Sequence, residues 1–510
     1  MELSALLSGY DGISRWQKGL DRNMDVRSAV ADSRAVETGD VFVALQGEYH
    51  DGHQYIQQAI QRGAAALILE NEERCGKDEP WILVKNSREL YGVMEQNLAG
   101  KPSLKMNVIG VTGTNGKTTV VHMLAAILEA AGKKTGLIGT IYNRVGERSL
   151  ETELTTPGSA ELADLFRRMA EEKTEYVVME VSSHALAQSR TAGIEFDLAI
   201  FTNLSQDHLD YHRNMNEYLS AKAKLFSGLN PQGEKKRKKA AILNQDDGSS
   251  AYIADYCRVP AITYGLGELC HVRAKDIELS DYGARYTLLY GGETHEIRLS
   301  LHGRFNVYNS LAAIAAALIE GIEIRVIERA LENMAPVAGR FQQVDSSGAG
   351  LPFQVYVDYS HTPDSLEKCI QTARELCKGR IISVFGAGGH RDVEKRPVMG
   401  ETAARLSDIA IVTSDNPRDE APESIIHDIL KGMQGPTARA EVMTEPDRRK
   451  AIGLALTVAQ RGDMVLICGK GHEDYQIIGR TRYPFDDYAE ARAAMTNLTD
   501  QRGSELCPNT

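Results

Sequence analysis

Short apolar runs, separated by stretches of helical periodicity, recur along most of the chain. Near the start, "DVFVALQG" and "AALILE" lie on either side of the helical stretch "HQYIQQAIQRG". This arrangement predicts a small α/β domain. Three later runs have the continuous apolar character of buried parallel strands: "NVIGV", "EYVVMEV" and "FDLAIFTN". They predict a second, mostly parallel sheet.

The last third of the chain repeats the alternation of strand and helix. Its apolar runs are "FQVYVDY", "IISVFG", "DIAIVTS" and "MVLICG". Regular alternation of this kind is typical of a doubly wound, Rossmann-like sheet. The sequence therefore predicts an α/β protein with three sheets.

Two glycine- and proline-containing stretches interrupt the pattern, "AGKPSLKMN" and "NMAPVAGRFQQV". With 510 residues the chain is too long for a single core. We expect an N-terminal domain at 1–103, a central nucleotide-binding domain at 104–338 and a C-terminal domain at 339–510.

Composition narrows the class of protein. The chain is 42% apolar, and no apolar run is long enough to cross a bilayer. The start "MELSALLSGYDGISRW" lacks the basic and apolar regions of a secretory signal, so we expect a cytoplasmic protein without membrane insertion. Seven cysteines without a C-x-x-C pair favour reduced thiols over disulfides or a zinc site.

A net charge of −12 argues against a nucleic-acid partner, because backbone binding requires clustered positive charge. One basic run, "EKKRKK" at 234–239, is the exception. Charge blocks are usually solvated loops, so we expect a loop there, with contact to a polyanion as the alternative.

The stretch "GVTGTNGKTTV" predicts a phosphate-binding loop, although Val111 replaces the first glycine of the usual pattern. It joins an apolar strand to a helix expected from Lys117 to about Ala131. Strand, glycine turn and helix N-terminus together direct N–H groups at one point, as phosphate binding requires. Lys117 would reach the outer phosphates and Thr118 would hold a magnesium ion.

A second metal ligand is expected at the end of a neighbouring strand. Glu180 ends the run "EYVVME", although an acidic residue there is also common on surfaces. His208 and His212 lie four apart and could pair as zinc ligands on a helix, but a third ligand is missing.

Nine segments resemble the Mur ligases in sequence and order, and the resemblance as a whole extends from about Asp32 to Asp487. They are "GVTGTNGKTT", "EVSSHAL", "TNLSQDHLDYH", "YLSAKAKLF", "GRFNVYN", "DYSHTPDSLE", "RPVMGE", "DNPR" and "GKGHEDYQ". Within that family the resemblance is greatest to members that add diaminopimelate. The shortened phosphate loop is the form that this family uses.

The resemblance implies an ATP-dependent amide ligase of peptidoglycan synthesis. A carboxylate of UDP-MurNAc-dipeptide would attack ATP to give an acyl phosphate, and the amine of meso-diaminopimelate would then displace phosphate. Positioning and neutralisation of negative charge should dominate such catalysis. We expect a monomer. L-lysine or another amino acid as acceptor, and a non-catalytic nucleotide-binding relative, remain alternatives.

The resemblance also implies roles for individual residues. Catalysis is assigned to Lys117, Glu180, His208 and Lys222, and ATP binding to Gly113, Thr114, Asn115, Gly116, Lys117, Thr118, Thr119, Asn306, Asn309, Arg340 and Asp358. The Mg²⁺ site would comprise Thr118, Glu180, His208 and Lys222, the last carbamylated by carbon dioxide. Carbamylation turns a cation into an anion, and the nearby Lys224 is the alternative position.

The UDP-sugar substrate is assigned by resemblance to Ser33, Thr155, Thr156, Ser183, Gln188 and Arg190. Hydroxyls and an arginine are suitable phosphate donors. Ser33 lies in the segment "DSRAVETGDVFVALQGEYHDGH", and an ordinary helix-cap or turn serine is the alternative there.

Diaminopimelate is assigned to Arg391, Asp415, Asn416, Arg418, Gly469 and Glu473. Diaminopimelate carries a second carboxylate that lysine lacks, and Arg418 could hold it with a bidentate fork. Lysine would leave that arginine unpaired. A simple turn at "DNPR" is the alternative.

Two positions depart from the family pattern. Ser360 replaces an alanine, which could alter packing beside the nucleotide, and His390 replaces Asp or Asn. The stretch "FGAGGHRD" follows a predicted strand, but Arg391 occupies the place of the third glycine in a dinucleotide fingerprint. A nicotinamide enzyme is therefore disfavoured.

Overall fold

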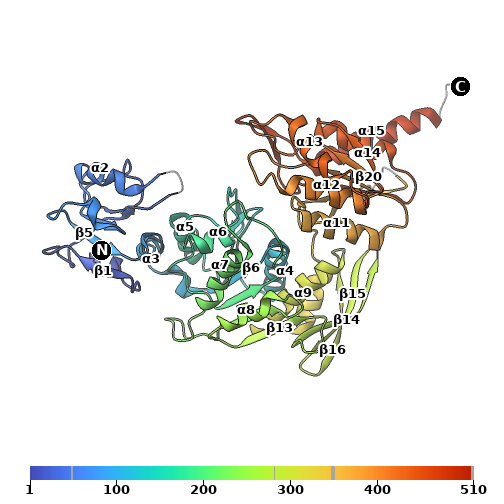
Figure 1. Cartoon of the computed structure of the whole chain (residues 1–510). Helices are drawn as coiled ribbons and strands as arrows, with labels where there is room; N and C mark the ends of the chain where they lie inside the picture. The colour runs from blue at the N-terminus through green and yellow to red at the C-terminus, as the bar shows by residue number, and fades with distance from the viewer. Residues whose placement is uncertain (48–49, 281, 346–350, 507–510) are drawn as a thin grey trace.

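Three large sheets follow one another along the described chain, and each has helices packed on it (Figure 1); a fourth sheet has two strands. The structure is a computed structural model that describes residues 1–47, 50–280, 282–345 and 351–506. It confirms the predicted α/β class with mostly parallel sheets. The exact domain limits remain predictions. The UDP-sugar segment proposed from sequence includes residues 48 and 49, which lie outside the described residues, as does Cys507.

The first sheet has five strands in the order β1-β5-β4-β3-β2, and only β1 is antiparallel to its neighbour. Its strands are β1 (Ile13–Trp16), β2 (Ala29–Val30), β3 (Val41–Val43), β4 (Ala66–Leu69) and β5 (Trp81–Val84). The helices are α1 (Leu3–Leu6), α2 (Ile56–Gln61) and α3 (Ser87–Leu98). On α3, Gly92 leaves room for the central domain: a Cβ there would lie 2.9 Å from the Cβ of Ala192.

The central sheet has eleven strands in the order β16-β15-β14-β13-β12-β11-β6-β10-β7-β8-β9. Its parallel strands are β6 (Asn107–Thr112), β7 (Thr135–Ile138), β10 (Tyr176–Glu180), β11 (Leu198–Phe201), β12 (Ala240–Asn244) and β13 (Ala261–Gly265). The strands β8 (Asn143–Val145), β9 (Arg148–Leu150), β15 (Gly283–Tyr290) and β16 (Glu293–Leu299) form antiparallel edges, and β14 (Val272–Ser280) joins β13 to β15.

Helices cover both faces of the central sheet. They are α4 (Lys117–Ala130), α5 (Ser159–Glu171), α6 (Ser183–Ala187), α7 (Met215–Ser227), α8 (Ser249–Asp255), α9 (Arg304–Ile319) and α10 (Ile324–Glu332). The expected helix after the phosphate loop is therefore present, and Gly132 follows its end with φ of +75°. Glycine accepts this left-handed conformation without strain.

The C-terminal sheet has six strands in the order β17-β18-β22-β19-β20-β21, all parallel except β17. The strands are β17 (Gln342–Gln343), β18 (Gln354–Asp358), β19 (Ile381–Phe385), β20 (Ile409–Val412), β21 (Glu441–Thr444) and β22 (Met464–Cys468). The helices are α11 (Pro363–Leu376), α12 (Lys395–Leu406), α13 (Pro422–Gly432), α14 (Arg448–Val458) and α15 (Asp487–Leu506), and β23 (Tyr475–Ile478) pairs with β24 (Thr481–Pro484).

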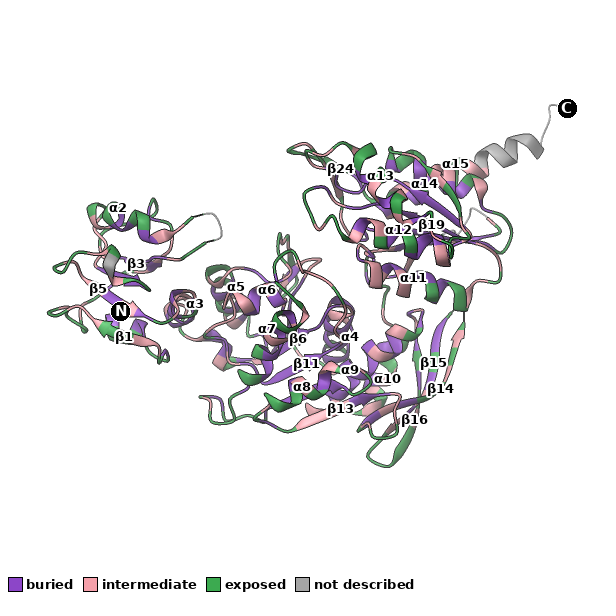
Figure 2. Cartoon of the chain, viewed as in Figure 1, coloured by how far each residue is buried: buried purple, intermediate pink, exposed green. Residues whose placement is uncertain are grey.

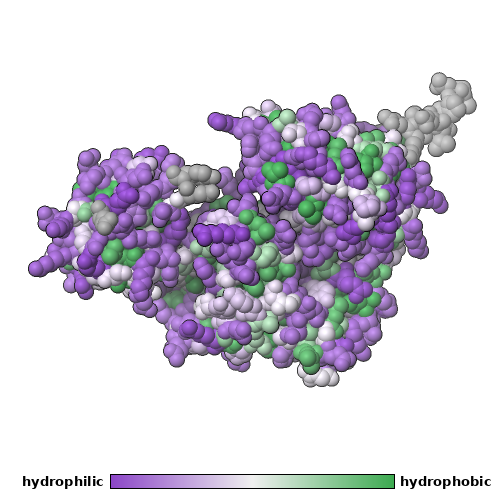
Figure 3. Space-filling model, in the orientation of Figure 1, coloured by the Kyte–Doolittle hydropathy of each residue, from purple (hydrophilic) through white to green (hydrophobic). Residues whose placement is uncertain are grey.

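Buried residues follow the strands of each sheet, while the outer faces of the helices are exposed (Figure 2). The face seen in Figure 3 is largely hydrophilic, with apolar residues scattered over it. Among the described helices, none combines the length and apolarity needed to span a membrane. The six cysteines in the described part of the chain are free thiols.

The basic run at 234–239 is a loop, as expected, but it is only partly solvated. The Lys235 ammonium lies 2.6 Å from Asp197 and the Lys239 ammonium 2.5 Å from Glu195, and both lysines are buried. Buried charges require partners. Two of the five basic residues therefore hold the loop onto the central domain.

Candidate active site

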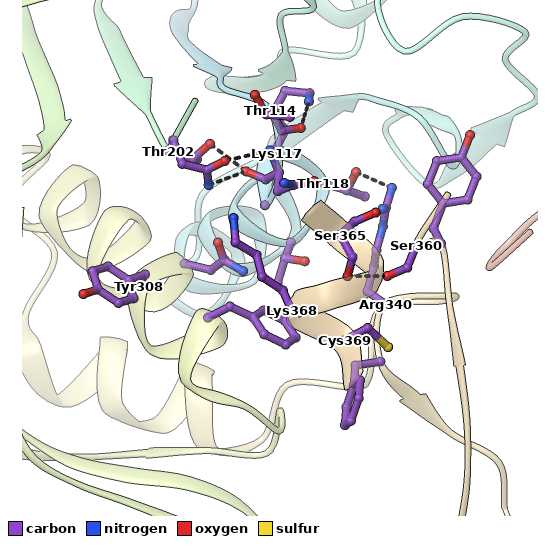
Figure 4. Close-up of a pocket in the computed structure, with 18 of the residues that line it drawn as sticks. Thr114, Lys117, Thr118, Thr202, Tyr308, Arg340, Ser360, Ser365, Lys368 and Cys369 are labelled. Atoms are coloured by element: carbon purple, nitrogen blue, oxygen red, sulfur yellow. Dashed lines mark hydrogen bonds between the residues drawn. The ribbon is translucent and has the colours of Figure 1, made fainter. Parts of the chain in front are cut away.

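A cavity of about 580 Å³ opens between the central and C-terminal domains (Figure 4). Its walls include the phosphate loop, the carboxyl ends of β6, β10 and β11, and the first turns of α9 and α11. In a parallel sheet, this edge is where ligands bind. Of the proposed ATP residues, Thr114, Asn115, Gly116, Lys117, Thr118, Thr119, Asn309, Arg340 and Asp358 line the cavity.

The phosphate loop holds two lysine ammonium groups at one oxygen. Lys117 donates to the Gly113 carbonyl at 3.0 Å, and Lys222 of α7 donates to the same oxygen at 2.8 Å. Burial lowers the pKa of both amines, and Lys117 lowers that of Lys222 further. Lys224, the alternative position for carbamylation, is exposed to solvent.

Glu180 ends β10 beside the phosphate loop and is fully buried. Its carboxylate accepts hydrogen bonds from the Thr118 hydroxyl at 3.0 Å and from the Thr140 N–H at 2.8 Å. The Thr140 hydroxyl also donates to Glu180, at 3.0 Å. Arg340, from the C-terminal side, donates to the Thr118 hydroxyl at 2.9 Å. Glu180 is therefore not a surface residue, and that alternative from the sequence analysis is wrong.

Hydroxyl and carboxylate oxygens are the ligands that Mg²⁺ prefers, and Mg²⁺ keeps several waters and substrate phosphates. Thr118 and Glu180 fit that ion. The described residues contain no group of three or more His, Cys, Asp or Glu side chains arranged to hold a metal. A site for Mg²⁺ does not need such a group, because water and phosphate complete its shell.

His208 lies on a turn and not on a helix, with φ of +55°. Its ring is 4.7 Å from that of His184, and burial lowers its pKa although Asp207 opposes the shift. His212 instead pairs with the Ser183 hydroxyl at 3.0 Å. The helical pairing of His208 and His212 considered from sequence is therefore wrong.

Asn306 and Asn309 lie on α9 and bond to each other at 3.0 Å. Asn309 explains why position 116 is glycine: a Cβ there would lie 2.4 Å from the Asn309 amide oxygen, and φ is +86°. Asp358 accepts the Phe341 N–H at 2.7 Å. Ser360 forms hydrogen bonds with Asp358 and, at 3.0 Å, with the Ser365 carbonyl, so its extra hydroxyl is accommodated.

The C-terminal domain also reaches the phosphate loop through Asp364, a residue that the sequence analysis did not select. Its carboxylate accepts from Asn115 and from Ser205, each at 2.7 Å. Lys368 of the same helix donates to it at 2.8 Å. These contacts join α11 to two loops of the central domain.

Three of the residues proposed for the sugar substrate, Thr156, Gln188 and Arg190, form one cluster beside Glu180. Thr156 donates to the Glu180 carbonyl at 2.9 Å, and Arg190 donates to the Thr156 carbonyl at 2.9 Å. Gln188 accepts from Arg190 at 2.7 Å. Ser183 begins α6 and is buried.

Thr155 lines the large cavity, and its hydroxyl oxygen lies 3.1 Å from that of Thr140, within hydrogen-bond distance. Ser33 belongs to the first domain, where it sits in a turn and donates to Gln58 at 2.7 Å. Ser33 is therefore a turn serine in its local structure, one of the alternatives considered from the sequence. Its contact with a substrate stays a prediction.

The residues proposed for diaminopimelate gather at the carboxyl end of the C-terminal sheet. Asn416 donates to Glu473 at 2.9 Å, and Lys470 donates to the same carboxylate at 2.8 Å. Gly469 has φ of +121°, and a Cβ there would lie 2.7 Å from Asp415. Burial raises the pKa of Asp415, but Lys470 and Arg448 more than offset this and the net pKa is lowered.

Arg418 and Arg391 flank the glycine turn after β19. A Cβ on Gly388 would lie 3.1 Å from the Arg418 guanidinium and 3.5 Å from the Arg391 side chain. Arg418 donates to the Gly389 carbonyl at 2.8 Å. His390 has φ of +49° and donates its N–H to Glu420; histidine, like Asp and Asn, is enriched in this region.

Sequence reasoning missed Thr140, Asp364 and Lys470. Lys470 lies within the quoted motif "GKGHEDYQ" and is fully buried, so its motif could have identified it. Asp364 likewise lies within the motif "DYSHTPDSLE". Thr140 lies in none of the quoted motifs, and its role follows from contacts across the fold.

Three family models match the chain. The Mur ligase family catalytic domain matches residues 26–97, the Mur ligase middle domain 111–317 and the Mur ligase glutamate ligase domain 339–471. The chain is 44% identical to UDP-N-acetylmuramoyl-L-alanyl-D-glutamate–2,6-diaminopimelate ligase of Geobacillus kaustophilus, over 97% of this chain and 99% of that protein. The enzyme of the same name from Bacillus velezensis is 43% identical, over 93% and 95%.

The chain is also similar to solved structures. A structure of UDP-N-acetylmuramoyl-L-alanyl-D-glutamate–2,6-diaminopimelate ligase is 30% identical, with a TM-score of 0.68 and coverage of 98% of this chain and 99% of that chain. The Mycobacterium tuberculosis folylpolyglutamate synthase with ADP is 17% identical, with a TM-score of 0.63 and coverage of 76% and 92%. The latter similarity concerns the fold alone.

Proposed function

The chain belongs to the Mur ligase family, and from that premise we propose that it joins meso-diaminopimelate to UDP-N-acetylmuramoyl-L-alanyl-D-glutamate with consumption of ATP. The reaction yields UDP-MurNAc-tripeptide, ADP and phosphate. Relatives that carry this activity in their names match nearly the whole chain. The observation that supports the chemistry most strongly is the convergence of Lys117 and Lys222 on one carbonyl of the phosphate loop.

The first step forms an acyl phosphate. The glutamate carboxylate of the dipeptide attacks the γ-phosphorus of ATP, and the bond to ADP breaks. Lys117 and the N–H groups at the start of α4 neutralise the phosphate oxygens. Thr118 and Glu180 would hold Mg²⁺, which supplies further charge neutralisation. We propose that His208 belongs to the same Mg²⁺ site, as the resemblance implies.

The second step forms the amide. The uncharged amine of the acceptor attacks the acyl carbon, phosphate leaves, and the amine loses a proton. Arg340 donates from the C-terminal side to Thr118, so it lies beside the phosphate site and can neutralise the departing group.

We propose that Lys222 carries a carbamate. Carbamylation joins the uncharged amine to carbon dioxide and releases a proton. The lowered pKa of this buried amine favours the uncharged form that reacts. The resulting anion would relieve the repulsion between Lys117 and Lys222 and add an oxygen ligand for Mg²⁺. A carbamate signal in ¹³C NMR after addition of ¹³C-bicarbonate, absent in Lys222→Ala, tests this assignment.

The acceptor would bind where Arg418 and Arg391 flank the glycine turn. A guanidinium can hold the second carboxylate of meso-diaminopimelate with two parallel hydrogen bonds. Asp415 and Asn416 would meet the neighbouring amino group. The sugar nucleotide would extend from Ser33 across Thr155, Thr156, Ser183, Gln188 and Arg190. We further propose that the protein acts as a cytoplasmic monomer.

Mass spectrometry of the product tests the function. The purified protein is incubated with UDP-MurNAc-dipeptide, ATP, Mg²⁺ and meso-diaminopimelate, and each substrate is omitted in turn. Appearance of UDP-MurNAc-tripeptide only in the complete mixture supports the proposal. Absence of the product from the complete mixture, with the protein shown to bind ADP, contradicts it.

A further inference from the structure

One carboxylate of the C-terminal domain contacts two separate loops of the ATP site. Asp364 lies in the first turn of α11, where Thr362 and Ser365 form a capping box. An acidic residue is stable at this end of a helix because of the helix dipole. One of its oxygens accepts from both Asn115 and Ser205, each at 2.7 Å.

Asn115 lies in the phosphate loop and faces the C-terminal domain. Asn203 accepts its backbone N–H at 3.0 Å, and its carbonyl accepts the Thr202 hydroxyl at 2.7 Å. Its side-chain amide donates to Asp364 and to Ser205, the latter at 3.3 Å. The position of this side chain therefore depends on both domains.

Ser205 belongs to the segment that leads to Asp207 and His208. Its N–H donates to the Thr114 hydroxyl at 3.0 Å, so it is also tied to the phosphate loop. Ser205 is three residues from His208 in the chain. Asp364 thus reaches the phosphate loop and the segment of His208 together.

The ion pair between Asp364 and Lys368 does not explain why Asp364 contacts both loops of the central domain. Lys368, four residues later on α11, donates to it at 2.8 Å, and the two side chains are 43% and 28% exposed. Exposed pairs at this spacing contribute little to stability. The hydrogen bonds across the domain boundary are the ones that the carboxylate can make only when the C-terminal domain is seated.

We propose that Asp364 is a positioning residue that couples seating of the C-terminal domain to assembly of the ATP site. The kinetic test of this inference rests on the proposed function, whereas the tests by ADP binding and by scattering do not. When the domain is seated, Asp364 fixes Asn115 and Ser205 and thereby the loop that holds the phosphates. When the domain moves away, both side chains lose their charged acceptor.

Kinetics of Asp364→Asn test the proposal against a matched control. We expect kcat to fall about 10- to 100-fold, because charge-assisted hydrogen bonds to two partners are weakened. We expect the Kd for ADP with Mg²⁺, measured by calorimetry, to change less than about threefold, since the loop backbone and Lys117 remain. Glu367→Gln, on the same helix but bonded to Gln371 and Arg405, should keep wild-type kcat.

A double-mutant cycle separates positioning from general stabilisation. If Asp364 acts through Asn115, adding Asp364→Ala to Asn115→Ala should lower kcat much less than it does in the wild type. In scattering with bound ADP, Asp364→Asn should have a larger radius of gyration than Glu367→Gln.

Additive losses in the cycle, or equal kcat for Asp364→Asn and Glu367→Gln, overturn the proposal. Equal scattering of the two variants also overturns it. If all variants lack ligase activity while the scattering and ADP results hold, the proposed function fails and the coupling stands.

Discussion

Lys117 and Lys222 place their ammonium nitrogens on the same oxygen, the carbonyl of Gly113. Lys117 begins α4, whereas Lys222 comes from α7, so the fold brings together two cations that are far apart in sequence. Such a pair is unfavourable unless an anion joins it. The phosphates of ATP supply one anion, and a carbamate on Lys222 would supply another.

Lys222→Ala should lower kcat by about 100-fold or more, because the site loses a group that neutralises or coordinates at the transferring phosphoryl. Lys224→Ala is the matched control, since Lys224 lies on the same helix but is exposed, and should remain active. Chloride or short carboxylates such as formate should restore part of the activity of Lys222→Ala. Full activity in that variant would remove Lys222 from the mechanism.

Arg418→Ala should reduce the preference for meso-diaminopimelate over L-lysine. Loss of a charge-assisted contact with the second carboxylate should cost about 2 to 4 kcal/mol in kcat/KM for diaminopimelate, with little change for lysine. Steady-state kinetics with both acceptors measure the ratio. An unchanged ratio would move carboxylate recognition to another residue, and Arg391→Ala is the next variant to measure.

Gly469→Ala should raise the KM for the acceptor. The alanine would strain the backbone at φ of +121° and bring its Cβ within 2.7 Å of Asp415. The KM for ATP should change little. Gly453→Ala provides the control, because Gly453 lies inside α14 with nothing within 4 Å of the added Cβ. That variant should be as stable as the wild type or more so; equal kinetics for both variants would contradict the placement of Asp415.

The Glu195–Lys239 pair should make the central domain sensitive to acid. Burial raises the pKa of Glu195, but its hydrogen bonds with Lys239 and backbone N–H groups more than offset this, and the net pKa is lowered. The resulting stability is present above the ordinary glutamate pKa and is lost as pH falls through the lower folded value.

Glu195→Gln should therefore be less stable than the wild type by about 1 to 3 kcal/mol at neutral pH, and the difference should narrow below about pH 4. Urea unfolding followed by circular dichroism measures it. Glu171→Gln removes an exposed pair with Arg167 and should cost less than about 0.5 kcal/mol. If the stability difference between Glu195→Gln and the wild type does not change with pH, titration of the Glu195 carboxyl does not contribute to it.

The sequence predicted those features of the fold that neighbouring residues determine. Apolar runs predicted the parallel strands β6, β10 and β11, and the glycine loop predicted the start of α4 at Lys117. The motif order also predicted the family. These features depend on neighbouring residues, so local patterns contain them.

Features set by distant contacts were not predictable in this way. The antiparallel strands β14, β15 and β16 extend the central sheet without a signal that the sequence analysis recognised. The four-residue spacing of His208 and His212 left open a zinc pair on a helix, although a third ligand was missing, and the structure places His208 outside any helix with a positive φ. Asp364 stands 249 residues from Asn115, and only the packing of two domains brings them together.

The central claim is the choice of acceptor, and phosphate release tests it most directly. The protein is supplied with ATP, Mg²⁺ and UDP-N-acetylmuramoyl-L-alanyl-D-glutamate, and release is compared with meso-diaminopimelate and with L-lysine. We predict a kcat/KM for meso-diaminopimelate at least about 100-fold above that for L-lysine, since lysine leaves Arg418 unpaired. Equal release with both amines, or release only with lysine, would contradict the assignment.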